Sequence, residues 1–356
     1  MRAPAKAATL ALFLTAIGWA QTSKLVFFDA PGAGDVFPQG TFPGHITRDG
    51  VIAGDYVDSS NAYHGFLRTV DGVIISIDVP GAASTYVTGI NRAGVIAGYY
   101  GVDNLSIGYL RDPDGVFTTF RVPGSPATHT AGINSEGKIV GFYADSSGVY
   151  HGFERCVDGL LVTFDAPGAG HKSGQGTSPA SINLDGVIVG SYQDASSVNH
   201  GFLRTPDGAF TLFDAPNAGS SPNEGTFPSQ INPEGVIAGF YSDAFQLQHG
   251  FLRSPNGETT SVDVPPAVLP AGASAIATFI DGLNAEAAVV GSTVFTLDPN
   301  PYTRAFLRKP NGEFTTFGIP GAGFYGTTFN GINSVGDIVG SYGDTRGAFH
   351  AFLITP

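Results

Sequence analysis

The stretch INLDGVIVGSYQDASSVNHGFLRTPDGAFTLFDAP, residues 182–216, contains the pattern that decides the fold. It holds four short runs rich in Val, Ile, Phe and Thr, separated by turn sequences such as Asn-x-x-Gly and Pro-Asp-Gly. Runs of this composition between such turns are typical of β-strands joined by tight hairpins. No run has the period or the length of a helix. The stretch therefore predicts a four-stranded antiparallel unit.

The unit recurs along the chain, and each copy is marked by an Ile-Asn pair at the end of its first strand. The seven anchors lie 43 to 52 residues apart and are Ile46-Thr47, Ile90-Asn91, Ile133-Asn134, Ile182-Asn183, Ile231-Asn232, Leu283-Asn284 and Ile332-Asn333. Self-similarity at a fixed period indicates one structure built from repeated units. Four strands at about this period are typical of the blades of a β-propeller. We expect each anchor Asn to cap a turn, a role that Thr47 can also fill.

The two chain ends complement each other. The last copy stops at HAFLITP (residues 350–356) without a fourth strand, and KLVFFDAP (residues 24–31) supplies that strand at the front. A solenoid would need atypical capping repeats at its ends, so it does not explain this arrangement. The sequence predicts an all-β fold: a seven-bladed β-propeller of four-stranded blades, closed by residues 23–30 pairing beside residues 349–355.

The N-terminus resembles a secretory signal. Arg2 and Lys6 precede an apolar stretch at residues 7–17, and small residues at Gly18 and Ala20 fit a cleavage site between Ala20 and Gln21. We expect a signal peptide at residues 1–20, a single propeller domain at residues 21–356, and a secreted protein, extracellular or periplasmic, without a membrane anchor. Cys156 is the only cysteine, which excludes an intramolecular disulfide.

The net charge of the chain indicates which classes of binding partner to expect. The formal net charge is −13, and nucleic-acid binders need a basic surface, so we expect no nucleic-acid partner. Such a surface also avoids anionic lipid. We expect a monomer. The sequence contains no recognisable set of metal ligands, so no cofactor is expected, and nothing in it supports the possible binding of Ca²⁺.

Five copies carry the pattern Tyr-x-Asp-x5-His around the second hairpin: Tyr56/Asp58/His64, Tyr143/Asp145/His151, Tyr192/Asp194/His200, Tyr241/Asp243/His249 and Tyr342/Asp344/His350. A carboxylate can fix the tautomer of an imidazole, so five metal or acid–base sites are one interpretation. A catalytic site needs groups that converge from different elements, whereas this pattern repeats around a ring. We favour a buried polar clip, used five times. Ion pairs across the next hairpin are also predicted, between Arg68 and Asp78, Arg155 and Asp165, Arg204 and Asp214, and Arg253 and Asp263.

At these motifs the chain resembles the secreted bacterial repeat proteins named for a His-Ala-Phe (HAF) signature. The match is literal at His350-Ala351-Phe352 and near at the His-Gly-Phe copies that begin at His64, His151, His200 and His249. The flanking GIN-x-x-G-x-I-V-G and DG-x-F-T-T-F segments are similar as well. The resemblance implies an exported repeat protein and supplies no catalytic residues.

The topology indicates where a ligand would bind. Strands alternate in direction, so the second hairpins and the connections between blades open on one face, and these connections vary most in length. His45, His129 and His171 lie in these connections. Phe42, Tyr86, Phe227 and Phe279 recur four residues before the anchor, with His129 in the same slot. These seven residues are candidate ligand contacts at the channel mouth, although packing between blades and solvated loops explain them more simply.

We expect a non-catalytic binding or scaffold protein that acts through its loop-rich face on a glycan or a protein. The alternatives are a carbohydrate-active enzyme (a glycan hydrolase or lyase) and a multivalent lectin, each with a site at the channel mouth. An enzyme should show acids with perturbed pKa values that break the repeat. Unique polar residues are few and scattered in this sequence, which favours the binding protein.

Overall fold

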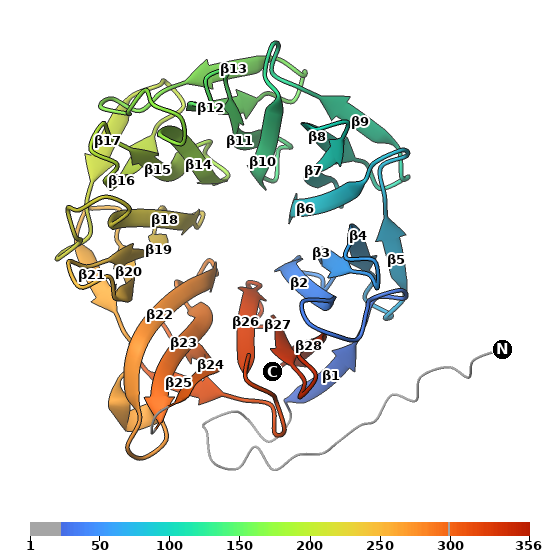
Figure 1. Ribbon diagram of the computed structural model, residues 1–356, viewed down its shortest axis with the longest axis vertical. Coiled ribbons are helices and arrows are strands. Elements are labelled where there is room, and N and C mark those ends of the chain that lie inside the picture. Colours follow the sequence, from blue (N-terminus) through green and yellow to red (C-terminus); the bar gives the residue numbers. More distant parts are fainter. Residues whose placement is uncertain (1–22, 298–299) are drawn as a thin grey trace.

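The computed structural model describes residues 23–297 and 300–356, and in these residues 28 strands and one short 3₁₀ helix are arranged in a ring (Figure 1). The expected signal peptide at residues 1–20 lies outside the described residues. The strands pair antiparallel in consecutive sets of four, and each set is called a blade below. The predicted all-β propeller class is confirmed.

The first four blades follow the repeat. Blade I contains β2 (Gly40–Ile46), β3 (Ile52–Val57), β4 (Tyr63–Arg68) and β5 (Ile74–Ile77). Blade II contains β6 (Ser84–Ile90), β7 (Ile96–Val102), β8 (Leu105–Arg111) and β9 (Phe117–Phe120). Blade III contains β10 (Ala127–Ile133), β11 (Ile139–Ala144), β12 (Tyr150–Arg155) and β13 (Leu161–Phe164). Blade IV contains β14 (Gly176–Ile182), β15 (Ile188–Gln193), β16 (Asn199–Arg204) and β17 (Phe210–Phe213).

The remaining blades include the 3₁₀ helix and both chain ends. Blade V contains β18 (Gly225–Ile231), β19 (Ile237–Ser242), β20 (Gln248–Arg253) and β21 (Thr259–Val262), and η1 (Pro266–Val268) follows it. Blade VI contains β22 (Ser274–Leu283), β23 (Val289–Leu297), β24 (Asn300–Arg308) and β25 (Phe314–Phe317). Blade VII contains β26 (Thr327–Ile332), β27 (Ile338–Gly343), β28 (Phe349–Thr355) and β1 (Lys24–Phe28).

The first strand of the chain lies on the last blade. β1 pairs antiparallel with β28, with Lys24 opposite Thr355 and Phe28 opposite Ala351. Figure 1 shows this strand beside the C-terminal strands, next to the beginning of blade I. The side of the last blade that faces blade I is called the seam below.

The hydrophobic core lies between consecutive blades. The third strand of each blade contributes one fully buried aromatic residue: Phe66, Tyr109, Phe153, Phe202, Phe251, Phe306 or Phe352. Each ring packs with apolar residues at the start of the second strands of its own and the preceding blade; Phe202, for example, packs with Ile188 and Val140. The glycine that follows these residues in each second strand is required by the close approach of the inner strand, since a Cβ on Gly190 would lie 2.3 Å from the carbonyl oxygen of Ser178.

The anchor asparagines join the blades to one another. Each side-chain oxygen caps its own turn as predicted; that of Asn183, for example, accepts the Val187 N–H at 2.9 Å. Each side-chain amide also donates to the backbone carbonyl at the anchor of the next blade, a role that the sequence did not reveal. This chain runs from Asn91 through Asn134, Asn183, Asn232, Asn284 and Asn333 to Thr47, with bonds of 3.0 to 3.4 Å.

A second set of repeated bonds joins the blades at their other end. A threonine in the first strand of each blade is almost fully buried, and its hydroxyl accepts an N–H just after the outer strand of the preceding blade. The accepting residues are Thr41, Thr85, Thr128, Thr177, Thr226, Thr278 and Thr327, at 2.9 to 3.4 Å. Because a buried N–H without a partner is costly, these bonds fix the angle between neighbouring blades.

The predicted ion pairs between the third-strand arginines and the outer-strand aspartates are wrong. Each arginine instead lies over a phenylalanine of the preceding blade: Arg68 over Phe28, Arg155 over Phe120, Arg204 over Phe164 and Arg253 over Phe213, at 4.6 to 5.2 Å from the ring centroid. Burial favours this contact because an aromatic ring attracts the cation without the cost of desolvating a second charge. Arg204 also pairs with a carboxylate, that of Glu154 in the preceding blade, at 3.6 Å. The aspartates have another partner, described below.

Candidate functional site

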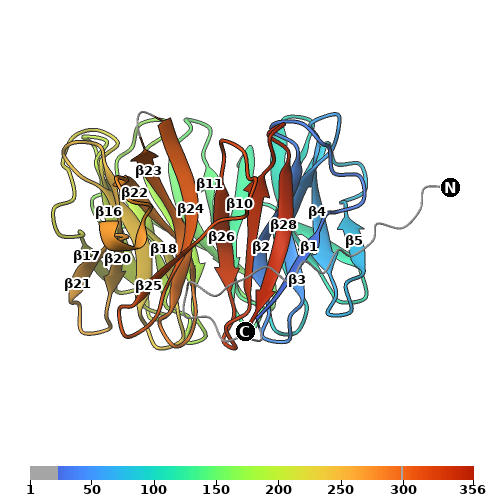
Figure 2. The same ribbon diagram turned by 90° about the horizontal axis from the view of Figure 1, so that it is seen from below.

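The two faces of the ring differ in their loops. One carries the tight turns after the first and third strands, and the other, the loop-rich face, carries the second hairpins and the connections between blades (Figure 2). Each long connection lies against the hairpins of the blades on either side. In the connection before blade IV, for example, the Gln175 carbonyl accepts the Tyr150 N–H, and the Gln175 side chain donates to the Ala195 carbonyl.

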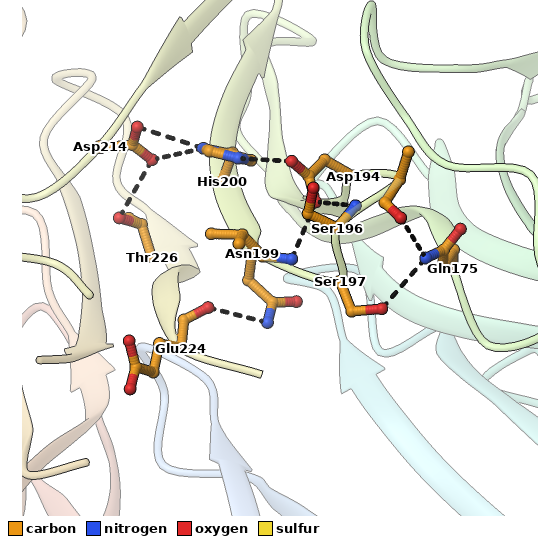
Figure 3. A network of polar contacts seen from close by, with 11 residues as sticks. Gln175, Asp194, Ser196, Ser197, Asn199, His200, Asp214, Glu224 and Thr226 are labelled. Carbon is orange, nitrogen blue, oxygen red and sulfur yellow. Dashed lines mark hydrogen bonds and ion pairs between the residues drawn. The ribbon is translucent and has the colours of Figure 1, made fainter. Parts of the chain in front are cut away.

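The five predicted Asp–His clips are present on this face, but each contains a second aspartate. Nδ1 of the histidine lies 2.7 to 3.0 Å from the aspartate that follows the outer strand, in the pairs His64–Asp78, His151–Asp165, His200–Asp214, His249–Asp263 and His350–Asp29. Nε2 lies 3.4 to 3.7 Å from the predicted hairpin aspartate, which is Asp58, Asp145, Asp194, Asp243 or Asp344. Figure 3 shows His200 between Asp194 and Asp214.

The clip is not buried as predicted. The histidine side chains are 21 to 26 % exposed and the outer aspartates 43 to 51 %. The repeated tyrosine stacks on the imidazole; the Tyr56 and His64 ring centroids, for example, are 4.8 Å apart. Solvent reaches the group because the outer strand is short and leaves its aspartate at the rim of the blade.

The clip joins the second hairpin of a blade to the end of its outer strand, and these contacts use most of its polar atoms. The hairpin aspartate uses one oxygen to accept N–H groups of its own loop; in blade I, bonds from the Ser60 hydroxyl and the Ala62 N–H lower the pKa of Asp58 to about 2. Both ring nitrogens of the histidine face carboxylates, Nδ1 at hydrogen-bond distance and Nε2 farther away. In the part of the chain that the structure describes, no group of three or more His, Cys, Asp or Glu side chains has an arrangement that could hold a metal ion.

The predicted aromatic contacts lie in the inner strands and form separate clusters. Tyr86 and His129 both stack on Tyr99, at 4.7 and 4.3 Å, within a continuous row of rings that runs from Tyr63 in blade I to Tyr150 in blade III. In blades V and VI, Phe227 stacks on Phe240 and Phe279 meets Phe240 edge to face. Phe42 contacts Phe349 across the seam, at 4.9 Å. These rings join neighbouring blades, and their contact with a ligand stays a prediction.

The three histidines outside the clips do not share one region. His171 is exposed on the loop-rich face, as expected. His129 lies in β10 and His45 in β2, so the expectation that both lie in connections is wrong, because the inner strands begin several residues before the anchor. His45 lines a cavity of about 230 Å³ in the central channel, and burial lowers its pKa to about 4.

Two acids break the repeat, Asp55 and Asp281, and desolvation raises the pKa of each to about 7; Asp55 was not singled out from the sequence. Asp55 occupies a slot that other blades fill with Tyr, Phe or Ser, and its carboxylate accepts the Val87 N–H of the next blade at 2.8 Å. Two tyrosines of blade II lie near Asp55. Burial, followed by the charges of neighbouring groups that include Asp55, raises the pKa of Tyr99 to about 12 and also raises the pKa of Tyr109.

A cluster of four aromatic rings, two of them exposed, lies on the loop-rich face at the seam. We call it the seam patch; it consists of Phe37, Phe324, Tyr325 and Phe349. Phe37 lies flat on Tyr325, with centroids 4.7 Å apart and planes 3° apart, and Phe324 meets the edge of Tyr325. Phe37 is 52 % exposed and Phe324 is 64 % exposed. Exposed apolar residues that cluster in this way mark interaction sites on proteins.

The sequence contained a signal for this patch. The connections before blades I and IV have equal length and the same anchoring glutamine, Gln39 or Gln175, so Phe37 corresponds to Ser173. Both residues would contact a Cβ placed on the hairpin glycine beneath them, Gly347 or Gly148. A serine satisfies the fold at this slot, and the phenylalanine is therefore a departure that the fold does not require.

Comparison with known proteins supports the fold and nothing finer. No protein-family model matches the sequence, and no curated protein is similar to it in sequence. Among solved structures, the chain is similar to a catalytically inactive variant of virginiamycin B lyase from Staphylococcus aureus in complex with quinupristin, with a TM-score of 0.57, 17 % identity, and coverage of 94 % of this chain and 99 % of the lyase.

Two archaeal proteins also match. For the acylaminoacyl peptidase of Pyrococcus horikoshii the TM-score is 0.56 and the identity 11 %, over 88 % of this chain and 51 % of the peptidase. The β-propeller domain of the Trilobed protease from Pyrococcus furiosus, which has an open velcro topology, gives a TM-score of 0.53 and 8 % identity over 88 % of this chain and 95 % of that domain. At these identities the likeness shows a shared propeller fold.

Proposed function

We propose that the protein is an exported, non-catalytic binding module that holds its ligand on the loop-rich face at the seam. The observation that carries this proposal is the stacked pair Phe37–Tyr325, of which Phe37 is 52 % exposed. Propellers commonly place function in variable loops on a rigid scaffold, and three of the four side chains in the seam patch, those of Phe37, Phe324 and Tyr325, come from such loops. The resemblance to secreted His-Ala-Phe repeat proteins supports export. Among the described residues, no helix is long and apolar enough to cross a membrane.

Binding to panels of soluble polysaccharides and of displayed peptides tests the proposal. The full chain is compared with Phe37→Ser and with Phe245→Ser, which removes an 83 % exposed ring from the β19–β20 hairpin of blade V and serves as the matched control. We expect at least one ligand that Phe37→Ser loses and Phe245→Ser keeps. If every ligand found binds both variants equally, the seam is not the binding site.

A carbohydrate-active enzyme is the second candidate, favoured by Asp55. A carboxyl group with a pKa of about 7 suits general acid catalysis at neutral pH, and Asp55 breaks the repeat. Its hydrogen bond to Val87 and its place between blades I and II favour a packing role. Product release from the bound polysaccharide distinguishes the two. The binding module predicts no turnover, whereas turnover that Asp55→Asn abolishes would establish the enzyme.

A further inference from the structure

We propose that the seam patch is a binding site for a neutral saccharide, whose pyranose ring stacks on the open face of Phe37. This inference rests on the proposed function and names its ligand class. Tyr325 covers one face of the Phe37 ring, and because Phe37 is 52 % exposed, the opposite face is open to solvent. The C–H groups of a pyranose are apolar and weakly positive, which matches the negative face of an aromatic ring.

The ring is held in place before a ligand arrives. Tyr325, beneath Phe37, lies 5.4 Å from Phe349 and against the β27–β28 hairpin, where a Cβ on Gly343 would be 2.9 Å from its Cβ. Phe349 in turn contacts Phe42 of blade I. A stacking surface that is already ordered loses little conformational entropy on binding, so even one sugar ring can contribute measurable affinity.

Polar groups that can bind sugar hydroxyls lie in the chain segments next to Phe37. Asp35 is two residues before Phe37 in the chain. Arg346 directly precedes Gly347, and Gly347 lies against Phe37, since a Cβ added to this glycine would be 2.8 Å from the Cβ of Phe37. Arg346 bonds Asp35 at 3.1 Å and Asp344 at 3.2 Å, which orients its guanidinium. Asp35 is 75 % exposed and Arg346 is 57 % exposed. Together they offer donors and acceptors at fixed positions, as sugar hydroxyls require.

The surroundings disfavour a protein or an acidic polysaccharide. A stable protein interface buries about 800 Å² on each partner around an apolar core, whereas this patch has two exposed rings and is bordered at once by charged side chains. The formal charge of −13 and the exposed aspartates of the clips repel polyanions. A neutral ligand with apolar ring faces and hydroxyl groups fits both constraints.

Affinity electrophoresis and calorimetry with defined polysaccharides test this inference. The probes are neutral polymers (β-glucan, mannan, xylan, galactan and starch) and two anionic ones, polygalacturonate and hyaluronan. We expect the full chain to bind at least one neutral polymer and neither anionic one. Phe37→Ser, which copies the residue found at the equivalent slot of blade IV, should weaken binding by about tenfold or more. Phe37→Tyr, which keeps an aromatic ring, should bind more tightly than Phe37→Ser, and the distant control Phe245→Ser should keep the wild-type affinity.

The possible failures have different meanings. Equal thermal stability of the Phe37 variants shows that a loss of binding is not a loss of folding, and Arg346→Ala, which spares the rings, should weaken the same interaction. Absence of binding to every neutral polymer overturns the saccharide inference, as does neutral binding that Phe37→Ser leaves intact. Binding of a displayed peptide that depends on Phe37, without glycan binding, overturns the saccharide inference but keeps the proposed function.

Discussion

Nδ1 of His350 in β28 lies 2.9 Å from a carboxylate oxygen of Asp29, which follows β1 and is 321 residues earlier in the chain. Nε2 of the same ring lies 3.7 Å from Asp344 in the adjacent hairpin. The contact copies the His–Asp pairs that occur within blades I, III, IV and V, and here its two members come from opposite ends of the chain. The two ends of the chain are thus joined within blade VII by the same contact that occurs inside the other blades.

This pair makes stability depend on pH. The hydrogen bond to Asp29 and the nearby charges raise the pKa of His350 above its usual value of 6.5. Folding favours the protonated imidazole of His350, so the contribution of this pair to the free energy of unfolding is fully present below pH 6.5. It is lost as the pH rises through the raised pKa of His350. Chemical unfolding should show His350→Gln to be less stable than wild type by about 0.5 kcal/mol at pH 6, and this difference should shrink by pH 9. A difference that does not change with pH would contradict this role.

Removal of residues 23–30 should lower stability strongly. The strand pairs along β28, and Leu25 and Phe28 pack against core clusters on the two sides of blade VII. Loss of two such side chains costs about 3–5 kcal/mol, apart from the strand pairing itself. Thermal melting of the truncated chain checks this, and a synthetic peptide of residues 23–31 should restore part of the loss. An unchanged melting temperature would show that the strand does not hold the ring closed.

The asparagine chain predicts a graded series at one buried position. Asn183→Ala removes the cap of Val187 and the bond to the Asn232 carbonyl, which should destabilise the protein by about 1–3 kcal/mol. Asn183→Thr should cost less, since Thr47 shows that a threonine hydroxyl can still cap the turn. Unfolding in urea measures both variants. Equal stability of the alanine and threonine variants would mean that the cap contributes nothing.

Ionisation of Asp55 should lower the free energy of unfolding at high pH. Its folded pKa of about 7 is raised from 3.8, so stability is present at pH 4 and is lost as the pH rises towards and through 7. An asparagine side chain at this position cannot ionise but keeps an oxygen for the Val87 N–H. Asp55→Asn should therefore resemble wild type at pH 4 and exceed it by about 2 kcal/mol at pH 8. Denaturant titrations at both pH values test this, and a variant less stable than wild type at pH 8 would exclude a buried, strained carboxylate.

The sequence predicted many of the features that lie within one copy of the repeat. The Ile-Asn turns, the hairpins and the pairing of each histidine with its hairpin aspartate follow from residues close together in the chain. Contacts between copies were missed or assigned wrongly. Arg204 was matched with Asp214 across its own hairpin, but it lies over Phe164 of the preceding blade, which leaves Asp214 to His200. Periodicity fixes the unit but does not show which faces of neighbouring units meet.

The candidate site was harder to predict for a related reason. Five candidate residues occupy a position that repeats in the sequence: Phe42, Tyr86, His129, Phe227 and Phe279. In the structure they mostly contact other aromatic side chains of the propeller. The seam patch is visible only as a difference between connections that are otherwise alike, such as Phe37 against Ser173. Tyr325 comes from a connection of a different length, so its stacking on Phe37 required the three-dimensional structure.

Calorimetric titration with a neutral oligosaccharide distinguishes a site made by residues that break the repeat from sites made by the repeat itself. The described residues contain one seam patch and five Asp–His–Asp clips. The predicted stoichiometry is one ligand per chain, with binding lost in Phe37→Ser and kept in His200→Gln. A stoichiometry near five, reduced by one in His200→Gln and unaffected by Phe37→Ser, would contradict the seam site and establish a multivalent lectin.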